Sequence, residues 1–235
     1  MIKAVFFDWF NTLARYDPPR EELQSQVLEE FGIHVSPQKI RPALLIADKN
    51  YFEENAILPV RNRSPEEQSN VWLRYQTTVL TEAGIDVPED PATLLKILKR
   101  GQELQGYNFA LFDDVLSTLK ILKQRDLIIG LLTNLTTDMK PIYSELGLEP
   151  YINFVVTAGE VETDKPEPPI FLMALQRAGV NASEAVHVGD QPKIDITGAR
   201  GVGITPILID RYNLYPEVGD CTRIESLTEL VQYLQ

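Results

Sequence analysis

Five short stretches of the sequence are continuously apolar, and each ends in polar or turn-forming residues. Continuous rather than alternating apolarity is typical of strands that are buried on both faces. Apolar residues repeat with helical spacing over 114–124, just before the second stretch, and over 169–178, between the third and the fourth. Strands that alternate with helices predict an α/β fold with a parallel sheet and right-handed crossovers. The predicted strands are KAVFFD (3–8), LIIGLLTN (127–134), INFVVTAG (152–159), AVHVGD (185–190) and TPILID (205–210).

The segment between the first two predicted strands is about a hundred residues long, far more than one crossover needs. Its pattern predicts helices throughout: over 20–31, after Ser36-Pro37, after Ser64 and over 91–105. Ser64 and Glu67 match a capping box at one of these helix starts. We therefore predict a core of residues 1–15 and 109–235, and a helical subdomain of residues 16–108. Because it is inserted just after Asp8, we expect this subdomain to act as a lid or cap over the strand ends.

The charge and the cysteine content limit the partners that the protein can have. A formal net charge of −12 argues against nucleic acid as a partner, since that binding is driven by Lys and Arg. A small anionic substrate remains compatible, because a local site can be positive within an acidic protein. Cys221 is the single cysteine and fits a reducing compartment. The apolar N-terminus lacks the features of a signal peptide and no apolar run can span a bilayer, so we expect a cytoplasmic protein without a membrane partner.

Polar residues suited to catalysis follow the predicted strand ends or precede a predicted helix in four separate places. Ligands of parallel α/β sheets bind at the carboxyl ends of the strands, where we expect these clusters to converge. A carboxylate nucleophile, hydroxyl donors, a lysine and carboxylates for a hard cation are the set that phosphoryl transfer needs. His187, inside a predicted strand, is interpreted as a core histidine. The four clusters are Asp8 with Thr12, Thr133 with Asn134, Lys165, and Asp190 with Asp195.

The order and spacing of these clusters resemble the haloacid dehalogenase-like (HAD) superfamily of hydrolases, over essentially the whole chain. Its four motifs are matched by FFDWFNTL (6–13), LLTN (131–134), KPEPPIF (165–171) and GDQPKID (189–195). Each motif alone is weak, but four in the right order are specific. The resemblance implies a Rossmann-like, three-layer α/β/α core with a parallel sheet and an inserted helical cap of the C1 type.

The resemblance also implies a role for each matching residue. Asp8 would be the nucleophile and a magnesium ligand, Thr133 would bind the transferring group, and Lys165 would steady the nucleophile and the charge. The expected magnesium site is completed by the backbone carbonyl of Phe10 and by Asp190, with Asp195 in an outer or supporting role. Thr12 and Asn134 are the expected substrate-binding residues.

Phe10 departs from the pattern of the family's phosphatases, which have a second aspartate at this position. That aspartate protonates the leaving oxygen and then activates water, and such help is typically worth ~10²–10⁴-fold. Phenylalanine keeps the backbone carbonyl but lacks the acid. The sequence therefore predicts a magnesium-dependent phosphatase of a small phosphorylated metabolite with an intact metal site and a missing acid–base group.

Three alternatives remain open at the level of sequence. The family's 2-haloacid dehalogenases have a bulky residue at this position and need no metal, but here Phe171 replaces their expected tyrosine and GDQPKID keeps metal-type carboxylates. Phosphonate-cleaving relatives use a cap lysine, and neither Lys39 nor Lys49 has a context that marks it for this role. A catalytically impaired member that binds a phosphorylated ligand is the third. Nothing in the sequence specifies the oligomeric state.

Overall fold

The computed structural model describes residues 1–106 and 108–234. The chain divides into two compact units. The first joins Met1–Arg15 to Phe109–Gln235, and the second is the continuous segment Tyr16–Asn108.

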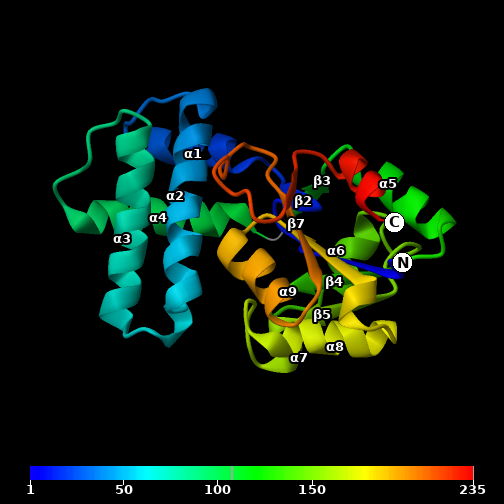
Figure 1. Cartoon of the computed structure of the whole chain (residues 1–235). Coiled ribbons are helices and arrows are strands. Elements are labelled where there is room, and N and C mark those ends of the chain that lie inside the picture. The colour runs from blue at the N-terminus through cyan, green and yellow to red at the C-terminus, as the bar shows by residue number, and fades with distance from the viewer. Residues whose placement is uncertain (107, 235) are drawn as a thin grey trace. The chain divides into compact units, whose positions relative to one another are not determined.

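The first unit is built on a six-stranded sheet in the order β5-β4-β1-β6-β7-β8, and all neighbouring strands are parallel (Figure 1). The predicted parallel α/β fold is thus confirmed, and each of the five apolar stretches contains one strand. The sixth strand, β8, was not predicted. The strands are β1 (Ala4–Phe7), β4 (Ile128–Thr133), β5 (Phe154–Thr157), β6 (Ala185–Gly189), β7 (Thr205–Ile209) and β8 (Thr222–Ile224).

The central strand β1 pairs with β4 on one side and with β6 on the other. In this register Phe7, the last residue of β1, lies opposite both Leu131 and Val188. The strands after β1 are therefore added on one side as β4 and β5 and on the other as β6, β7 and β8. This reversal of direction makes the end of β1 a topological switch point. The carboxyl ends of β1, β4 and β6 meet there, and the loops that follow them can share one site.

Helices flank the sheet and bury its side chains. Ile170 and Phe171 of α8 and Ala199 of α9 pack in one cluster with Phe6 and Leu132 of the sheet. Helix α5 lies beside β4 and the C-terminal 3-10 helix η4. The helices of this unit are α5 (Val115–Gln124), α6 (Lys140–Glu145), α7 (Ala158–Val161), α8 (Pro168–Ala178), η2 (Ala182–Glu184), η3 (Pro192–Ile196), α9 (Thr197–Gly201) and η4 (Leu227–Tyr233), and β2 (Ala14–Tyr16) pairs with β3 (Phe109–Leu111).

The second unit consists of helices, as its sequence pattern predicted. Ser64 and Glu67 form the predicted capping box at the start of α3. A buried polar network links three of the helices, because Arg20 donates to Asp48 at 2.7 and 3.1 Å and also contacts the hydroxyl of Tyr75. The helices are α1 (Arg20–Glu30), α2 (Pro37–Ile57), η1 (Val60–Asn62), α3 (Pro65–Glu82) and α4 (Pro91–Gln105).

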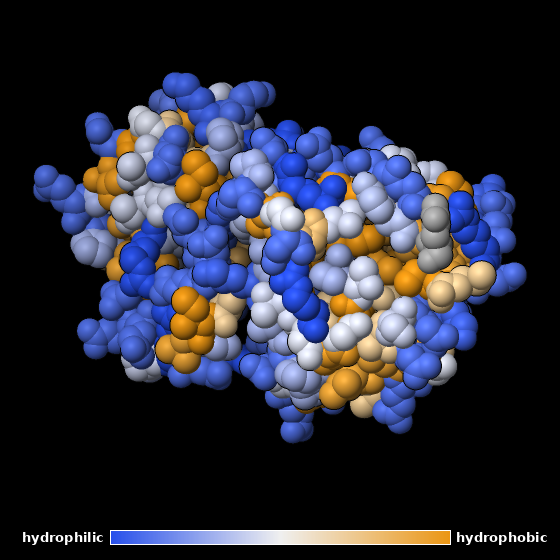
Figure 2. Space-filling view, in the orientation of Figure 1, coloured by the Kyte–Doolittle hydropathy of each residue, from blue (hydrophilic) through white to orange (hydrophobic). Residues whose placement is uncertain are grey.

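The surface is mainly hydrophilic on the face that Figure 2 presents, with smaller hydrophobic areas between the polar residues. The most exposed large apolar side chains inside helices include Ile57 of α2, Leu116 of α5 and Leu172 of α8, which belong to separate elements. Single exposures of this kind are ordinary in globular proteins. Among the helices of residues 1–106 and 108–234, none combines the length and apolarity that crossing a membrane requires.

Gly130 in β4 provides a test of how tightly the sheet is packed. A Cβ at this position would lie 2.5 Å from the ring of Phe154 and 3.0 Å from that of Phe6, and these two rings already meet edge to face. We expect Gly130→Ala to lower the free energy of unfolding by about 1–3 kcal/mol through overpacking. Urea unfolding followed by circular dichroism measures this change.

Gly201 at the end of α9 is the matched control, because a Cβ there meets no atom within 4 Å. Gly201→Ala should leave the stability unchanged or raise it by up to about 1 kcal/mol. Equal destabilisation by both substitutions would contradict the packing argument.

Candidate active site

Asp8 lies immediately after β1, at the switch point of the sheet. Its backbone N–H donates to the carbonyl of Val188 at 2.9 Å, which extends the pairing of β1 with β6 by one residue. Its side chain is largely buried, and the hydroxyl of Thr12 donates to Oδ2 at 3.3 Å. The carboxylate is therefore held at the strand end rather than left in solvent.

Lys165 connects Asp8 to a second carboxylate. Its Nζ donates to Oδ1 of Asp8 at 2.6 Å and to Oδ1 of Asp195 at 2.7 Å. The side chains of Lys165 and Asp195 are each 1% exposed, and that of Asp8 is 11% exposed. A buried ion set of this kind is strongly destabilised if one partner is removed, because an uncompensated charge remains.

Asp195 accepts hydrogen bonds on both carboxylate oxygens. Besides Lys165, its Oδ1 meets Nε2 of His187 at 2.9 Å, and its Oδ2 accepts from the backbone N–H of Gln191 at 3.1 Å. Gly189 makes this placement possible, because a Cβ at that position would overlap the carboxylate of Asp195. The glycine and the second aspartate of GDQPKID are thus linked by packing as well as by sequence.

The charges in this cluster shift one another's pKa values. Burial lowers the pKa of Lys165, but Asp195 and Asp8 outweigh that effect and hold it above the usual value. Burial raises the pKa of Asp195, yet the Lys165 charge and the hydrogen bond from His187 bring it well below its usual range. Lys165 and Asp195 are therefore a charged pair at neutral pH. Burial raises the pKa of Asp8, with Lys165 opposing the shift.

Asp190 is the third carboxylate of the cluster. Asp8, Asp190 and Asp195 each offer one oxygen, and these three oxygens lie within 4.8 Å of one another. Within the described residues, Oδ1 of Asp190 is buried and has no hydrogen-bond partner. Burial, and then the charges of Asp8 and Asp195, raise the pKa of Asp190 well above its usual range.

This donor set fits a hard divalent cation. When all three carboxylates are ionised, the single ammonium leaves two negative charges in a mostly buried cluster, and a divalent ion would balance them. Carboxylate oxygens are the ligands that such ions prefer. The orphaned oxygen of Asp190 would also gain a partner.

Thr133 and Asn134 follow the neighbouring strand. Thr133 ends β4 and its hydroxyl accepts from the N–H of Leu135 at 3.2 Å. Because Phe7 pairs with Leu131, Thr133 and Asp8 both lie near the same ends of adjacent strands. The Asn134 side chain donates to the Lys165 carbonyl at 3.1 Å and accepts from the Lys165 N–H at 2.7 Å, so it fixes the backbone that carries the lysine.

His187 also belongs to this cluster and was not predicted as a site residue. It is fully buried, as expected of a core histidine, but its ring contacts Asp195 and stands edge-on to Phe171 with centroids 5.2 Å apart. Side chains alternate between the two faces of a strand, so His187 and Gly189 lie on the same face. This spacing could have indicated His187 from the sequence. Gly189 is the residue against which Asp195 packs.

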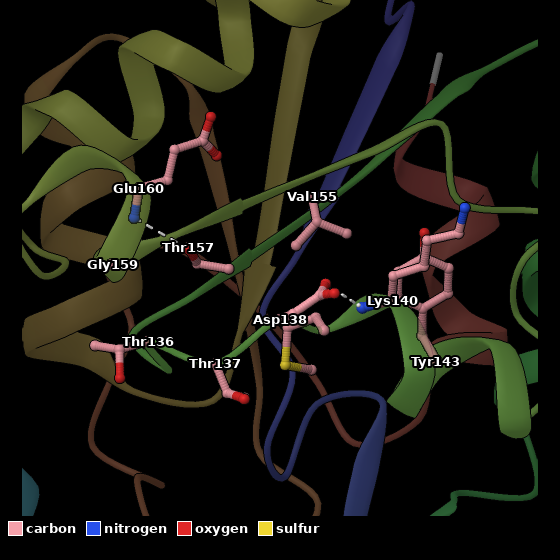
Figure 3. Close-up of a pocket in the computed structure, with 10 residues that line it drawn as sticks. Thr136, Thr137, Asp138, Lys140, Tyr143, Val155, Thr157, Gly159 and Glu160 are labelled. Carbon is pink, nitrogen blue, oxygen red and sulfur yellow. Dashed lines mark hydrogen bonds between the residues drawn. The ribbon is translucent and has the colours of Figure 1, made fainter.

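A pocket of about 360 Å³ opens beside β5 and the segment that follows β4 (Figure 3). Three threonine hydroxyls and several charged side chains line it, and none of the carboxylates of the cluster does. Two of its local hydrogen bonds, Lys140 N–H to Asp138 and Glu160 N–H to Thr157, stabilise the loops around it. Asp8, Asp190 and Asp195 are therefore not part of the wall of this pocket.

Comparisons with known proteins bear on the family to which this chain belongs. The family model described as haloacid dehalogenase-like hydrolase matches residues 2–203. The haloacid dehalogenase-like hydrolase domain-containing protein 3 of Danio rerio is 30% identical over 100% of this chain and 97% of its own length. The ribulose-1,5-bisphosphate 5-phosphatase of Halopiger xanaduensis is 39% identical over 89% of this chain and 85% of its own.

A solved structure, the 2-haloacid dehalogenase of Pseudomonas syringae pv. Tomato, covers 100% of this chain and 98% of its own, with 28% identity and a TM-score of 0.57. The family model, both relatives and the solved structure each match most of this chain. The chain therefore belongs to the haloacid dehalogenase-like family of hydrolases.

Proposed function

We propose that this hydrolase is a magnesium-dependent phosphatase that uses Asp8 as its nucleophile on a small phosphorylated metabolite. The observation that carries the proposal is the buried Lys165 ammonium between Asp8 and Asp195, with Asp190 in the same cluster. The similarity to a protein named as a sugar bisphosphate phosphatase supports the substrate class.

In the proposed reaction, a carboxylate oxygen of Asp8 bonds to phosphorus while the bond from phosphorus to the leaving oxygen breaks. Lys165 keeps the carboxylate of Asp8 charged and oriented for this attack. Hydroxyls of Thr133 and Thr12, with backbone N–H groups after Asp8, bind the phosphoryl oxygens. Water then attacks the phosphorus of the aspartyl-phosphate, which releases phosphate and restores Asp8.

Asp8, Asp190 and the backbone carbonyl of Phe10 would hold Mg²⁺, with Asp195 in a supporting role. When bound, the ion supplies positive charge against the phosphoryl oxygens. The three hydrogen bonds that Asp195 makes with Lys165, His187 and the backbone of Gln191 suit a residue that orients its neighbours.

Phe10 stands where an acid would protonate the leaving oxygen, so the proton must come from water or from another group. A substrate whose leaving oxygen is already a weak base needs this proton least. We propose that the hydrolysis rate of this enzyme depends more on the basicity of the leaving oxygen than the rate of relatives with two aspartates does.

We further propose that the helical unit Tyr16–Asn108 is a C1-type cap that selects the substrate. The proposal rests on connectivity, because the chain leaves the core at Arg15, shortly after Asp8, and returns at Phe109. Inserted segments near a nucleophile commonly gate access to it.

Dehalogenation of a 2-haloacid is the second candidate. Phe10 and the similarity to a solved 2-haloacid dehalogenase favour it. In that reaction Asp8 would attack carbon, halide would leave without a proton, and water would hydrolyse the ester. The carboxylate of Asp190 has no role in such a mechanism, which is why we place it second.

Asp8→Asn should lower kcat for phosphate release from aryl and sugar phosphates by at least about a thousandfold, because the amide cannot serve as the nucleophile. Steady-state assays with and without EDTA, with 2-chloropropionate included in the panel, measure this. Asp126→Asn is the matched control, since Asp126 is exposed, precedes β4 and already has the left-handed φ of 57° that asparagine tolerates. EDTA-resistant halide release would instead identify a dehalogenase, and phosphate binding without any turnover would identify a binding protein.

Phe10→Asp should raise kcat for alkyl phosphates by about tenfold or more, because it supplies the missing acid, and should change kcat for an aryl phosphate much less. Comparing sugar phosphates with p-nitrophenyl phosphate measures this difference. Phe10→Asn is the matched control, since it has the same shape as aspartate and no acid. An equal gain in both variants would attribute the effect to space rather than to proton transfer.

Asp190→Asn should weaken Mg²⁺ binding by at least about tenfold, because it removes a charged oxygen ligand from the cluster. Isothermal titration calorimetry with MgCl₂ in the absence of substrate measures the affinity. Binding of the same strength in Asp190→Asn and in Asp126→Asn would show that the ion lies elsewhere.

A further inference from the structure

The loop that follows Asp8 must be fixed for the nucleophile to be oriented. Of the two oxygens of Asp8, Oδ1 is held by Lys165 and Oδ2 accepts from the hydroxyl of Thr12. Thr12 itself is fully buried and lies in the turn between β1 and β2. Any group that anchors the backbone of Thr12 therefore acts on Asp8 through a single residue.

Arg211 supplies such an anchor from a distant part of the chain. It follows β7, and its Nη2 and Nε donate to the backbone carbonyl of Thr12 at 2.8 and 3.3 Å. Its side chain is only 9% exposed. Hydrogen bonds from a charged donor in such a buried position are stronger than neutral ones.

The guanidinium of Arg211 is in turn held on its other side. Nη1 and Nη2 donate to the two carboxylate oxygens of Asp114 at 2.9 Å each, and the group lies over the ring of Phe112 at 4.0 Å from its centroid. This planar fork bridges a carboxylate and a carbonyl, which a lysine cannot do with the same geometry.

Asp114 is anchored by the C-terminal segment. It accepts from the hydroxyl of Ser226 at 2.7 Å and from the backbone N–H of Leu227 at 2.8 Å. Burial raises the pKa of Asp114, but the hydrogen bonds from Arg211 and Ser226 outweigh it and hold the pKa below its usual value. The chain of contacts runs from Ser226 through Asp114 and Arg211 to Thr12, all within the core unit.

We propose that Arg211 is a positioning residue for the hydrolytic reaction, which fixes the Thr12 carbonyl and thereby the Thr12 hydroxyl against Asp8. The inference rests on the proposed role of Asp8 as the nucleophile. If Thr12 is loosened, Oδ2 of Asp8 loses the hydrogen bond from its hydroxyl. Because a displacement of about 1 Å at a reacting group can cost about 10²-fold in rate, the effect falls on the chemical step.

Arg211→Met should lower kcat about 10–100-fold, with KM for an aryl phosphate and inhibition by inorganic phosphate each changed less than about threefold. The loop keeps its own backbone bonds, Leu13 N–H to Trp9 and Asn11 N–H to Ala14. Thr133 and the backbone N–H groups after Asp8 therefore still bind the phosphoryl oxygens, and KM changes little. Guanidinium ion at millimolar concentration should restore part of the activity of Arg211→Ala. A merely structural ion pair would give neither the separation of kcat from KM nor the rescue.

Arg200→Met is the matched control, because Arg200 also pairs with an aspartate, Asp220 at 2.8 Å, on the exposed surface of the same unit. Its kcat should equal that of the wild type. In a double-mutant cycle, Arg211→Met should cost several-fold less kcat in a Thr12→Val background, since the hydroxyl that Arg211 positions is then gone.

Two results would overturn the inference. If Asp8→Asn is inactive while Arg211→Met keeps the wild-type kcat, Arg211 has no positioning role and the proposed function stands. If Asp8→Asn retains full hydrolysis, both the positioning role of Arg211 and the proposed function fail.

Should Arg211→Met not fold, Arg211→Lys gives the test, because it keeps a cation beside Asp114 and loses the planar guanidinium. A reduced kcat with unchanged KM supports the inference, and wild-type kcat in that folded variant contradicts it.

Discussion

The core unit depends on one buried ammonium group. Lys165 joins the carboxylate after β1 to the carboxylate after β6, and burying either charge without the other would be costly. The same residue is tied through its backbone to Asn134 after β4. One lysine therefore links the segments that follow the three strands at the switch point. Separating these segments would break the buried charge pairs that Lys165 forms with Asp8 and Asp195.

Packing around this ion set explains several residue choices that charge alone leaves open. The carboxylate of Asp195 occupies the space that a side chain at position 189 would need, so glycine is required there. His187, two residues earlier on the same face of the strand, contacts the same carboxylate. Arg211 likewise restricts Thr12, because its guanidinium donates to the Thr12 carbonyl. The carboxylate of Asp8, the proposed nucleophile, is thus surrounded by further contacts that restrict its orientation, a requirement for precise positioning.

Most of the fold followed from sequence because buried parallel strands are continuously apolar, as LIIGLLTN shows. Strand β8 was missed because it has three residues, Thr-Arg-Ile, at the sheet edge, and such a segment has no apolar run. Asp8, Lys165, Asp190 and Asp195 were predicted to converge because strand ends in a parallel sheet share one edge. Arg211 was not, since a lone arginine after a strand carries no spacing signal, and its partner Asp114 is 97 residues away. Only the folded register brings the two together.

Phe10 and the carboxylate cluster bear on different parts of the reaction. A haloacid carries its own carboxylate, and three acidic side chains with a single lysine leave surplus negative charge that would repel it. A phosphate monoester carries at least as much negative charge, but phosphoryl transfer commonly uses a divalent ion, which would balance this surplus and bind the ester oxygens as well. Carbon–halogen cleavage needs no cation, so it would leave the buried Oδ1 of Asp190 without a partner among the described residues. The charge balance of the site therefore favours phosphorus over carbon as the electrophile, and Phe10 bears on how the leaving oxygen obtains its proton.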